Sequence, residues 1–192
     1  MGFRDFIAKA QIGYLKSKAE GRQLSIPEDL LQPKHLLVCL PGGLRELTMV
    51  KQLLPTIAHL FKSADITLLT LPGIKVSDIY PRKGFQILTP TLDQITWTGL
   101  PKKSYLDTLC ENKFDTILDL NLEVSSFTST VLLKFPGAIR IGRGNHLGAP
   151  FYNLEIKTKY LRDERNIYRS LLATLAAIMK KPVDGLSPVT AY

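Results

Sequence analysis

The chain has 192 residues, of which 45% are apolar and 22% are charged. This composition is typical of a globular protein, and the length is enough for one domain with a substantial core. The apolar runs stay below the roughly 18 to 20 residues that a membrane-spanning helix needs, and the first residues lack the continuous apolar core of a signal peptide. We therefore interpret the chain as cytoplasmic.

The formal net charge is +8 at pH 7. Such an excess favours anionic partners, namely phosphorylated glycans, nucleotides, acidic membranes or nucleic acid, although a basic surface can also serve solubility alone. The sequence contains no zinc finger, no RNA-recognition motif of aromatic residues and no basic stripe interleaved with aromatics. We therefore predict no nucleic-acid partner.

Cysteine and histidine usage argues against a bound metal. Cys39 lies in an apolar run and is expected to be a small buried side chain, and with Cys110 it does not form a disulfide framework. The three histidines are far apart and form no cluster at metal-ligand spacing. We predict neither a metal nor a cofactor.

The first element in chain order is a helix over residues 3–20. Its apolar residues recur at helical spacing and basic residues lie between them. Such a helix either packs its apolar stripe on the domain or a partner, or lies on an anionic membrane at its inner face. Residues 25–33 contain two prolines and are expected to form a linker, so that 1–33 comprise a helix and a linker.

From residue 34 to 180 the chain alternates between strand and helix patterns. We expect strands at 35–40, 65–71, 85–88, 114–120, 138–141 and 152–157, and helices at 44–61, 75–80, 101–112, 124–134 and 163–180. Residues 91–98 fit either a loop or a short strand. This alternation predicts a single α/β domain with a Rossmann-like, mostly parallel sheet flanked by helices, followed by a tail at 181–192.

The segment KHLLVCLPGGLRELTMVKQLLP is the most informative part of this pattern. A buried strand breaks at Pro41-Gly42-Gly43, and a helix follows, which is the opening unit of a doubly wound fold. The third glycine of a dinucleotide fingerprint is missing and no Gly-Lys-Ser/Thr follows, so we expect neither a nicotinamide site nor a P-loop. Gly42 and Gly43 either cradle a ligand with their backbone or form a plain tight turn.

Four polar residues are candidates for the site. Glu46 falls in the first turn of the expected helix, where it either stabilises the helix or acts as a general base on a sugar hydroxyl. Its neighbour Arg45 is either solvated or contacts a phosphate or carboxylate. Asp119 and Asn121 end a strand, where they either line the cleft or cap the strand.

The order and spacing of several motifs resemble glycosyltransferase family 9, the heptosyltransferases of lipopolysaccharide biosynthesis. LLVCLPGGLRELTMVKQLLPTI is similar to the first strand, loop and helix of that family, and ADITLLTLPG is similar to its second strand. FDTILDL followed by GAIRIGRG is similar to its later strand block, and LRDERNIYRSLLATL to its late helix. The resemblance runs from about residue 34 to residue 178.

The resemblance implies the N-terminal, acceptor-binding half of a twin-Rossmann (GT-B) enzyme that needs no metal. In the family an acidic residue of the first loop is the catalytic base, and with Pro41 as an insertion that position falls on Glu46. The family has aspartate there, glycine at the position of Arg45 and arginine at the position of Cys39.

Two hypotheses follow from this resemblance. In the first, the chain is a sugar transferase half that handles an anionic glycan or nucleotide sugar, with a partner chain supplying the donor domain. In the second, it is a non-catalytic binding or scaffold module that pairs with a copy of itself. For the isolated chain we expect no autonomous catalysis, because orienting two substrates requires both halves of the cleft.

Overall fold

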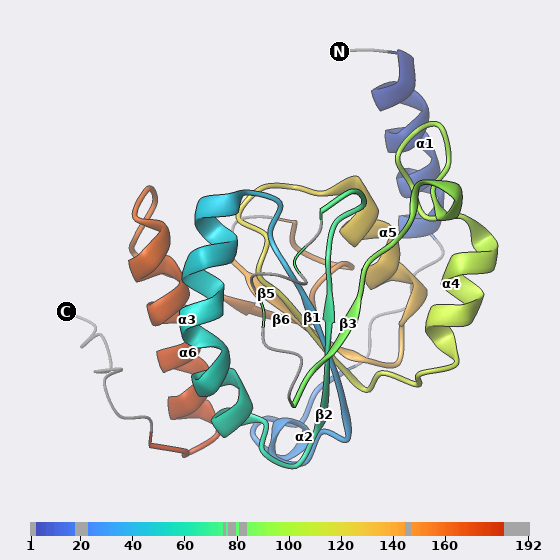
Figure 1. The fold of residues 1–192 in the computed structure, drawn as a ribbon. Helices are drawn as coiled ribbons and strands as arrows, with labels where there is room; N and C mark the ends of the chain where they lie inside the picture. The colour runs from blue at the N-terminus through green and yellow to red at the C-terminus, as the bar shows by residue number, and fades with distance from the viewer. Residues whose placement is uncertain are drawn as a thin grey trace.

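The computed structural model describes residues 3–17, 23–74, 76, 80, 84–144 and 147–182. Within these ranges a parallel sheet lies between two layers of helices (Figure 1). The sequence patterns explain both kinds of element, because apolar runs of about five residues form the buried strands and residues at helical spacing form the covering helices.

The strands are β1 (His35–Cys39), β2 (Asp65–Leu69), β3 (Gln86–Leu88), β4 (Thr116–Asp119), β5 (Ile139–Arg143) and β6 (Leu154–Ile156). The α-helices are α1 (Phe3–Ser17), α2 (Glu28–Leu31), α3 (Leu44–Leu60), α4 (Lys103–Cys110), α5 (Ser126–Lys134) and α6 (Glu164–Ile178). One turn of 3-10 helix covers Leu92–Gln94.

The strand order is β3-β2-β1-β4-β5-β6, and every pairing between these strands is parallel. The predicted Rossmann-like sheet is therefore confirmed. In such a sheet the chain winds outward in both directions from the centre, and the switch point lies between β1 and β4. The register places Cys39 opposite Asp119 at the carboxyl ends of these two strands, which is where a crevice is expected.

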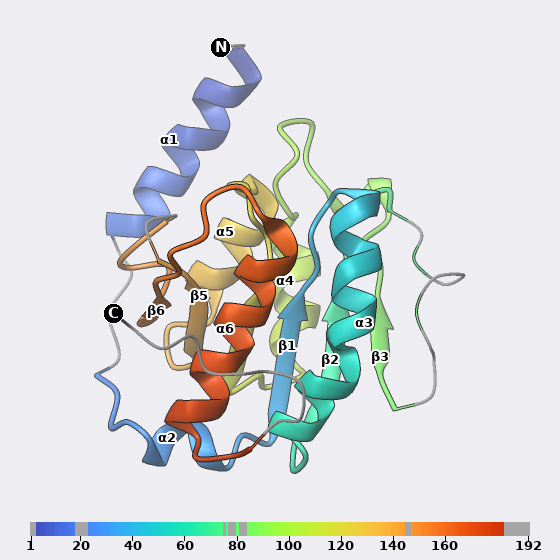
Figure 2. The same cartoon turned by 90° about the vertical axis from the view of Figure 1, so that its left-hand side faces the viewer.

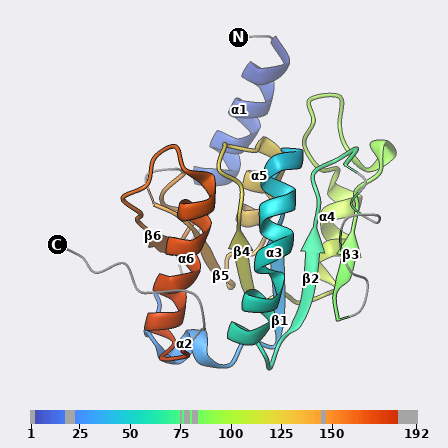
Figure 3. The same cartoon turned by 60° about the vertical axis from the view of Figure 1, so that its left-hand side comes forward.

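The sheet separates two apolar cores. On one face α3 and α6 pack together and cover residues such as Leu36, Val38 and Leu118 (Figures 2 and 3). On the other face α4 and α5 cover Leu37 and Ile117, and α1 packs against α5. Helices on both faces follow from the parallel pairing, because each crossover between neighbouring strands must pass over the sheet.

The structure differs from the sequence-based expectation in three places. The expected linker contains α2, whose Leu30 is fully buried in the core beneath α3 and α6. Residues 91–98 hold the 3-10 turn, and Ile95 then forms an isolated antiparallel bridge with Pro101. The β5 strand continues through Gly142 to Arg143 instead of ending at residue 141.

Two other expectations fall largely outside the described residues, namely the helix at 75–80 and the tail from residue 183 onward. In the ranges that the structure does describe, the helices are too short or too polar to cross a membrane.

Candidate functional site at the carboxyl edge of the sheet

The carboxyl edge at the switch point brings together the loop after β1 and the loop after β4. Glu46 lies in the first turn of α3, which follows β1, and Asp119 is the last residue of β4. Tyr168 of α6 lies near both carboxylates, and they contribute, after burial, to raising the pKa of its hydroxyl. The first turn of α3, the end of β4 and α6 therefore meet at this edge.

The two glycines of the first loop are exposed, and other side chains lie close to the backbone at both positions. Gly43 is the N-cap of α3 in an extended conformation, with φ −81° and ψ 136°, so its backbone does not require glycine. A Cβ built on Gly43 would lie 2.8 Å from Oε2 of Glu46, and one on Gly42 would lie 3.0 Å from Cδ1 of Leu71. Gly43 thus leaves the space that the Glu46 carboxylate occupies.

The carboxylate of Glu46 folds back onto the loop. Its Oε2 accepts a hydrogen bond from the backbone N–H of Gly43 at 3.2 Å, and the residue is partly buried. Burial raises the pKa of Glu46, the bond from Gly43 acts in the opposite direction, and the nearby carboxylates of Glu164 and Glu123 raise it further. A carboxylate with a raised pKa is a stronger base than an ordinary exposed glutamate.

Arg45 points to α6 rather than to an open site. Its Nε lies 3.1 Å from Oε2 of Glu164, without the alignment of a hydrogen bond, and the Arg45 side chain is 78% exposed. Such an ion pair contributes at most about 0.5 kcal/mol because water screens it. It links the first turns of α3 and α6, and the predicted contact of Arg45 with a ligand stays a prediction.

Asp119 and Asn121 belong to a buried hydrogen-bond network with Thr128 and Tyr152, here called the Asp119 network. Oδ1 of Asp119 accepts bonds from the backbone N–H and the side-chain amide of Asn121, at 3.0 and 2.7 Å. Oδ2 accepts the hydroxyl proton of Tyr152 at 2.7 Å, and the Asn121 amide also donates to Thr128 at 3.4 Å. The network ties together the end of β4, the start of α5 and the segment before β6.

Gly142 makes room for this network. A Cβ built on Gly142 would lie 2.3 Å from the ring of Tyr152, so the ring occupies the space that a side chain at this position would need. Burial and the Asp119 carboxylate together raise the pKa of Tyr152, so the phenol stays protonated and donates to Asp119. The sequence pattern treated Gly142 as the end of a strand and missed this contact, because residues 119, 142 and 152 are distant along the chain.

The hydroxyl-rich helix α5 is satisfied mainly by the protein itself. Ser125 caps the helix by accepting a bond from the N–H of Thr128, and Thr130 donates to the carbonyl of Ser126. The hydroxyl of Ser129 is buried and has no hydrogen-bond partner among the described residues. The side chains of α5 are therefore mostly core and capping groups.

Arg140 of β5 is fully buried on the same side of the sheet. Its Nη1 donates to the carbonyl of Leu132 at 3.3 Å, whereas Nε and Nη2 have no partner among the described residues. Burial lowers the pKa of this guanidinium. Sequence reasoning did not single out Arg140, because a buried arginine is not distinguishable from an exposed one at a single position.

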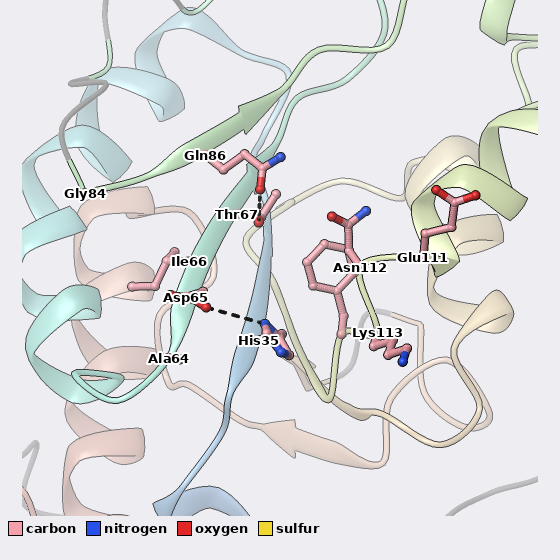
Figure 4. A pocket seen from close by; sticks show the side chains of 11 residues that line it. His35, Ala64, Asp65, Ile66, Thr67, Gly84, Gln86, Glu111, Asn112 and Lys113 are labelled. Carbon is pink, nitrogen blue, oxygen red and sulfur yellow. Dashed lines mark hydrogen bonds and ion pairs between the residues drawn. The ribbon is translucent and has the colours of Figure 1, made fainter.

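A hollow of about 730 Å³ lies at the opposite, amino edge of the sheet (Figure 4). Figure 4 shows two interactions on its wall, an ion pair between His35 and Asp65 with the ring Nδ1 3.7 Å from the carboxylate, and a bond at 3.5 Å from Thr67 to Gln86. Both members of the ion pair are largely exposed, so it is weak. Ligands of doubly wound folds bind at the carboxyl edge, and the hollow is not assigned a function.

The described residues contain no group of three or more histidine, cysteine, aspartate or glutamate side chains placed to hold a metal ion.

Comparison with known proteins supports the fold. No model of a protein family matches the chain, and no curated protein matches it. Among solved structures, the glycosyl transferase family 9 protein from Veillonella parvula DSM 2008 superposes with a TM-score of 0.54 at 14% identity, over 85% of this chain and 47% of that one. The E. coli heptosyltransferase WaaC with ADP gives 0.53 at 12% identity, over 82% and 49%.

These likenesses bear out the resemblance seen in the sequence at the level of the fold. The chain has the α/β architecture of glycosyltransferase family 9 structures and spans about half the length of each of the two.

Proposed function

We propose that this chain is a heptosyltransferase-like domain that binds a glycan acceptor at its carboxyl edge, with Glu46 as the base that takes the proton of the acceptor hydroxyl. The fold likeness supports the class of protein, since both solved structures are glycosyltransferases. The observation that carries the proposal is the Glu46 carboxylate, which is partly buried, has a raised pKa and lies beside the exposed Gly42-Gly43 loop.

The charges around Glu46 indicate which part of a glycan lies there. Glu123 and Glu164 surround the carboxylate, and the nearby cation, Arg45, is already paired with Glu164. An anionic group would be repelled at this point, whereas a neutral hydroxyl can donate to Glu46. We therefore place a hydroxyl-bearing ring next to Glu46 and assign any phosphate or carboxylate of an anionic glycan to positions farther out.

Asp119 and Asn121 have a supporting role in this proposal. The hydrogen bonds described above join them to protein groups, and both side chains are buried. They hold the loop after β4 against the first turn of α5 and thereby fix the end of β4. The ligand contacts proposed for this site are Glu46, Arg45 and the backbone of Gly42 and Gly43.

The proposal is tested by ligand-observed NMR of the purified chain with a panel of phosphorylated oligosaccharides and nucleotide sugars. We expect saturation transfer to a glycan. Glu46→Gln should lower the affinity for this glycan about tenfold or more, because a neutral amide oxygen is a weaker hydrogen-bond acceptor than a carboxylate. Arg45→Ala is expected to have a smaller effect, since the cation is exposed and paired with protein.

Glu111→Gln is the matched control, because Glu111 is an exposed glutamate that lines the hollow at the amino edge. It is expected to leave glycan binding unchanged. The proposed site would be contradicted if Glu111→Gln and Glu46→Gln weakened glycan binding equally. It would also be contradicted if the parent bound no glycan.

A second candidate function is a non-catalytic module that pairs with a copy of itself. The observation in its favour is that the loops around the candidate site expose large apolar side chains, with Leu44, Val124 and Leu161 exposed by 68%, 59% and 78%. Residues close to these three in the sequence interact with one another. Arg45 pairs with Glu164, and the carboxylates of Glu123 and Glu164 both act on Glu46. An apolar face of this kind is typical of a protein interface.

Sedimentation velocity separates the two candidates. The module would be favoured if the parent were a dimer that binds no glycan and if Leu44→Ser and Leu161→Ser made the protein monomeric. A monomer at high concentration that binds glycan would favour the acceptor domain.

A further inference from the structure

We propose that α1 and the segment that contains Trp97 together form a docking surface for an anionic lipid membrane. This inference goes beyond the proposed function and does not depend on it. It starts from α1, which carries two apolar stripes on opposite sides. Ala8 is buried and Ile12 packs against the core beneath α5, so one stripe holds the helix on the domain.

The second stripe of α1 faces away from the domain. Its members recur at intervals of three and four residues, as one face of a helix requires. They are Phe3, Phe6, Ala10 and Tyr14, and the three aromatic side chains are exposed by 74%, 67% and 59%. The domain-facing stripe anchors the helix, and the aromatic side chains of the outer stripe remain more than half exposed.

The outer stripe continues onto a second segment of the chain. The rings of Phe3 and Trp97 stack with their centroids 6.4 Å apart, and Trp97 is itself 59% exposed. Leu92, on the adjacent 3-10 turn, is exposed by 75%. Two segments that are about ninety residues apart in the sequence thus present large exposed apolar side chains that are joined by the Phe3–Trp97 stack. Such a group is larger than the single exposed apolar residues that are common on protein surfaces.

The net charge of these two segments favours a membrane over another apolar partner. Basic side chains outnumber acidic ones on α1 and on residues 91–103. The basic residues are Arg4, Lys9, Lys16, Lys102 and Lys103, and the acidic ones are Asp5 and Asp93. Aromatic residues combined with lysine and arginine match the interfacial zone of a bilayer, where aromatic rings lie at headgroup depth and cations contact anionic lipids.

The position of α1 is suited to this contact. Figures 1 and 2 show α1 projecting away from the body of the domain, beyond the edge at which α3 begins. The helix thus projects at the end of the molecule where the carboxyl edge of the sheet lies. The membrane contact expected from the N-terminal helix alone thus becomes a two-segment surface that includes Trp97.

The chain reports on this contact through its own fluorescence, because Trp97 is its single tryptophan. With vesicles of phosphatidylglycerol and phosphatidylcholine we expect a blue shift of Trp97 emission and quenching by brominated acyl chains. Vesicles of phosphatidylcholine alone should produce a much smaller change, and added salt should weaken binding, because screening removes the electrostatic share.

The double variant Phe3→Ser, Phe6→Ser is expected to weaken vesicle binding about tenfold or more, since it removes two apolar side chains from the bilayer contact. Ile26→Ser is the matched control, because Ile26 is exposed and precedes α2 at the amino edge. Unfolding midpoints of both variants, measured in urea, show that the fold is retained.

Two results would overturn the proposal. One is Trp97 emission that stays unchanged with anionic vesicles while the protein is folded. The other is a parent protein that dimerises and does not bind vesicles, together with a Phe3→Ser, Phe6→Ser variant that is monomeric. This result would assign the outer stripe to a second copy of the chain.

Discussion

The carboxyl ends of the adjacent strands β1 and β4 each lead to a carboxylate, and the two differ in how the protein uses them. Asp119 is buried, and each of its oxygens accepts a hydrogen bond from Asn121 or Tyr152. Glu46 is only partly buried, and its Oε2 accepts a hydrogen bond from the N–H of Gly43 at 3.2 Å. Two carboxylates at the same edge of the sheet thus have different surroundings. Asp119 belongs to a buried network, whereas Glu46 lies beside an exposed loop.

This difference shows how a polar residue at the carboxyl edge is to be interpreted. A strand-end carboxylate whose oxygens are engaged inside the protein stabilises the scaffold, and removing it leaves buried groups without partners. A carboxylate with unused acceptor capacity and a raised pKa is available to a ligand. The two regions should therefore respond in opposite ways to substitution, with stability lost at Asp119 and function lost at Glu46.

The largest expected effect is at Asp119. Asp119→Ala leaves the Tyr152 hydroxyl and the Asn121 amide without their acceptor in a buried site, and we expect a loss of about 3 kcal/mol in the free energy of unfolding. Urea unfolding followed by circular dichroism measures it. A loss below about 0.5 kcal/mol would remove the distinction between the two carboxylates.

The next effect tests whether the Tyr152 ring is part of the same structure. Gly142→Ala places a methyl group 2.3 Å from that ring, and we expect a loss of about 2 kcal/mol because the ring must move away from Asp119. The double variant Gly142→Ala, Tyr152→Leu should lose less than the sum of the single variants, since a leucine can yield where the ring cannot. Strict additivity would show that the contact carries no strain.

Arg140 allows a test of the opposite sign on the side of the sheet that holds the Asp119 network. Arg140→Met removes a buried charge, two of whose nitrogens have no partner among the described residues, and keeps a long apolar chain. We therefore expect unchanged stability or a gain of about 1 kcal/mol. Arg140→Ala is the control that leaves a cavity and should destabilise. If Arg140→Met destabilises as much as Arg140→Ala, the guanidinium has partners that stabilise the fold.

The smallest effect is the pH dependence at Glu46. Because the pKa of Glu46 is raised in the folded protein, the native state binds this proton more tightly than the unfolded state does. The contribution of Glu46 to stability is therefore present below its ordinary pKa and is lost as the pH rises through the raised value.

Urea unfolding of the parent and of Glu46→Gln measures this contribution. The stability of the parent relative to the variant should fall by a few tenths of a kcal/mol between about pH 4 and neutral pH, a small figure because the group is only partly buried and water screens it. Glu111→Gln should show no such trend. A relative stability that rises with pH would mean that the pKa of Glu46 is lowered, which would remove the support for a base at this position.

Local patterns were sufficient to predict most of the secondary structure. The apolar run 36–40 and the helical spacing after residue 44 correspond to β1 and α3, and the stripe at 167–178 corresponds to α6. The pattern also placed Glu46 in the first turn of a helix, because the turn and the helix start are both encoded by neighbouring residues. The one-turn helix α2 was missed, since four residues carry too little periodicity to identify a helix.

Long-range packing decided what the sequence alone did not. The sequence left open whether Asp119 lines a cleft or caps its strand, and only the contact with Tyr152, 33 residues after Asp119, showed that its carboxylate is engaged inside the protein. The stacking of Phe3 on Trp97 and the burial of Arg140 are likewise invisible in a linear pattern.

The alternation of strands and helices, the parallel sheet and the carboxylate at the start of α3 were all predictable from the amino-acid order, because they depend on periodicity and on neighbouring residues. The tertiary structure decided which polar side chains are saturated, which aromatic side chains stay exposed and which glycine makes room for a ring. Each of these depends on atoms brought together from distant parts of the chain, and burial and hydrogen bonding have no counterpart in sequence order.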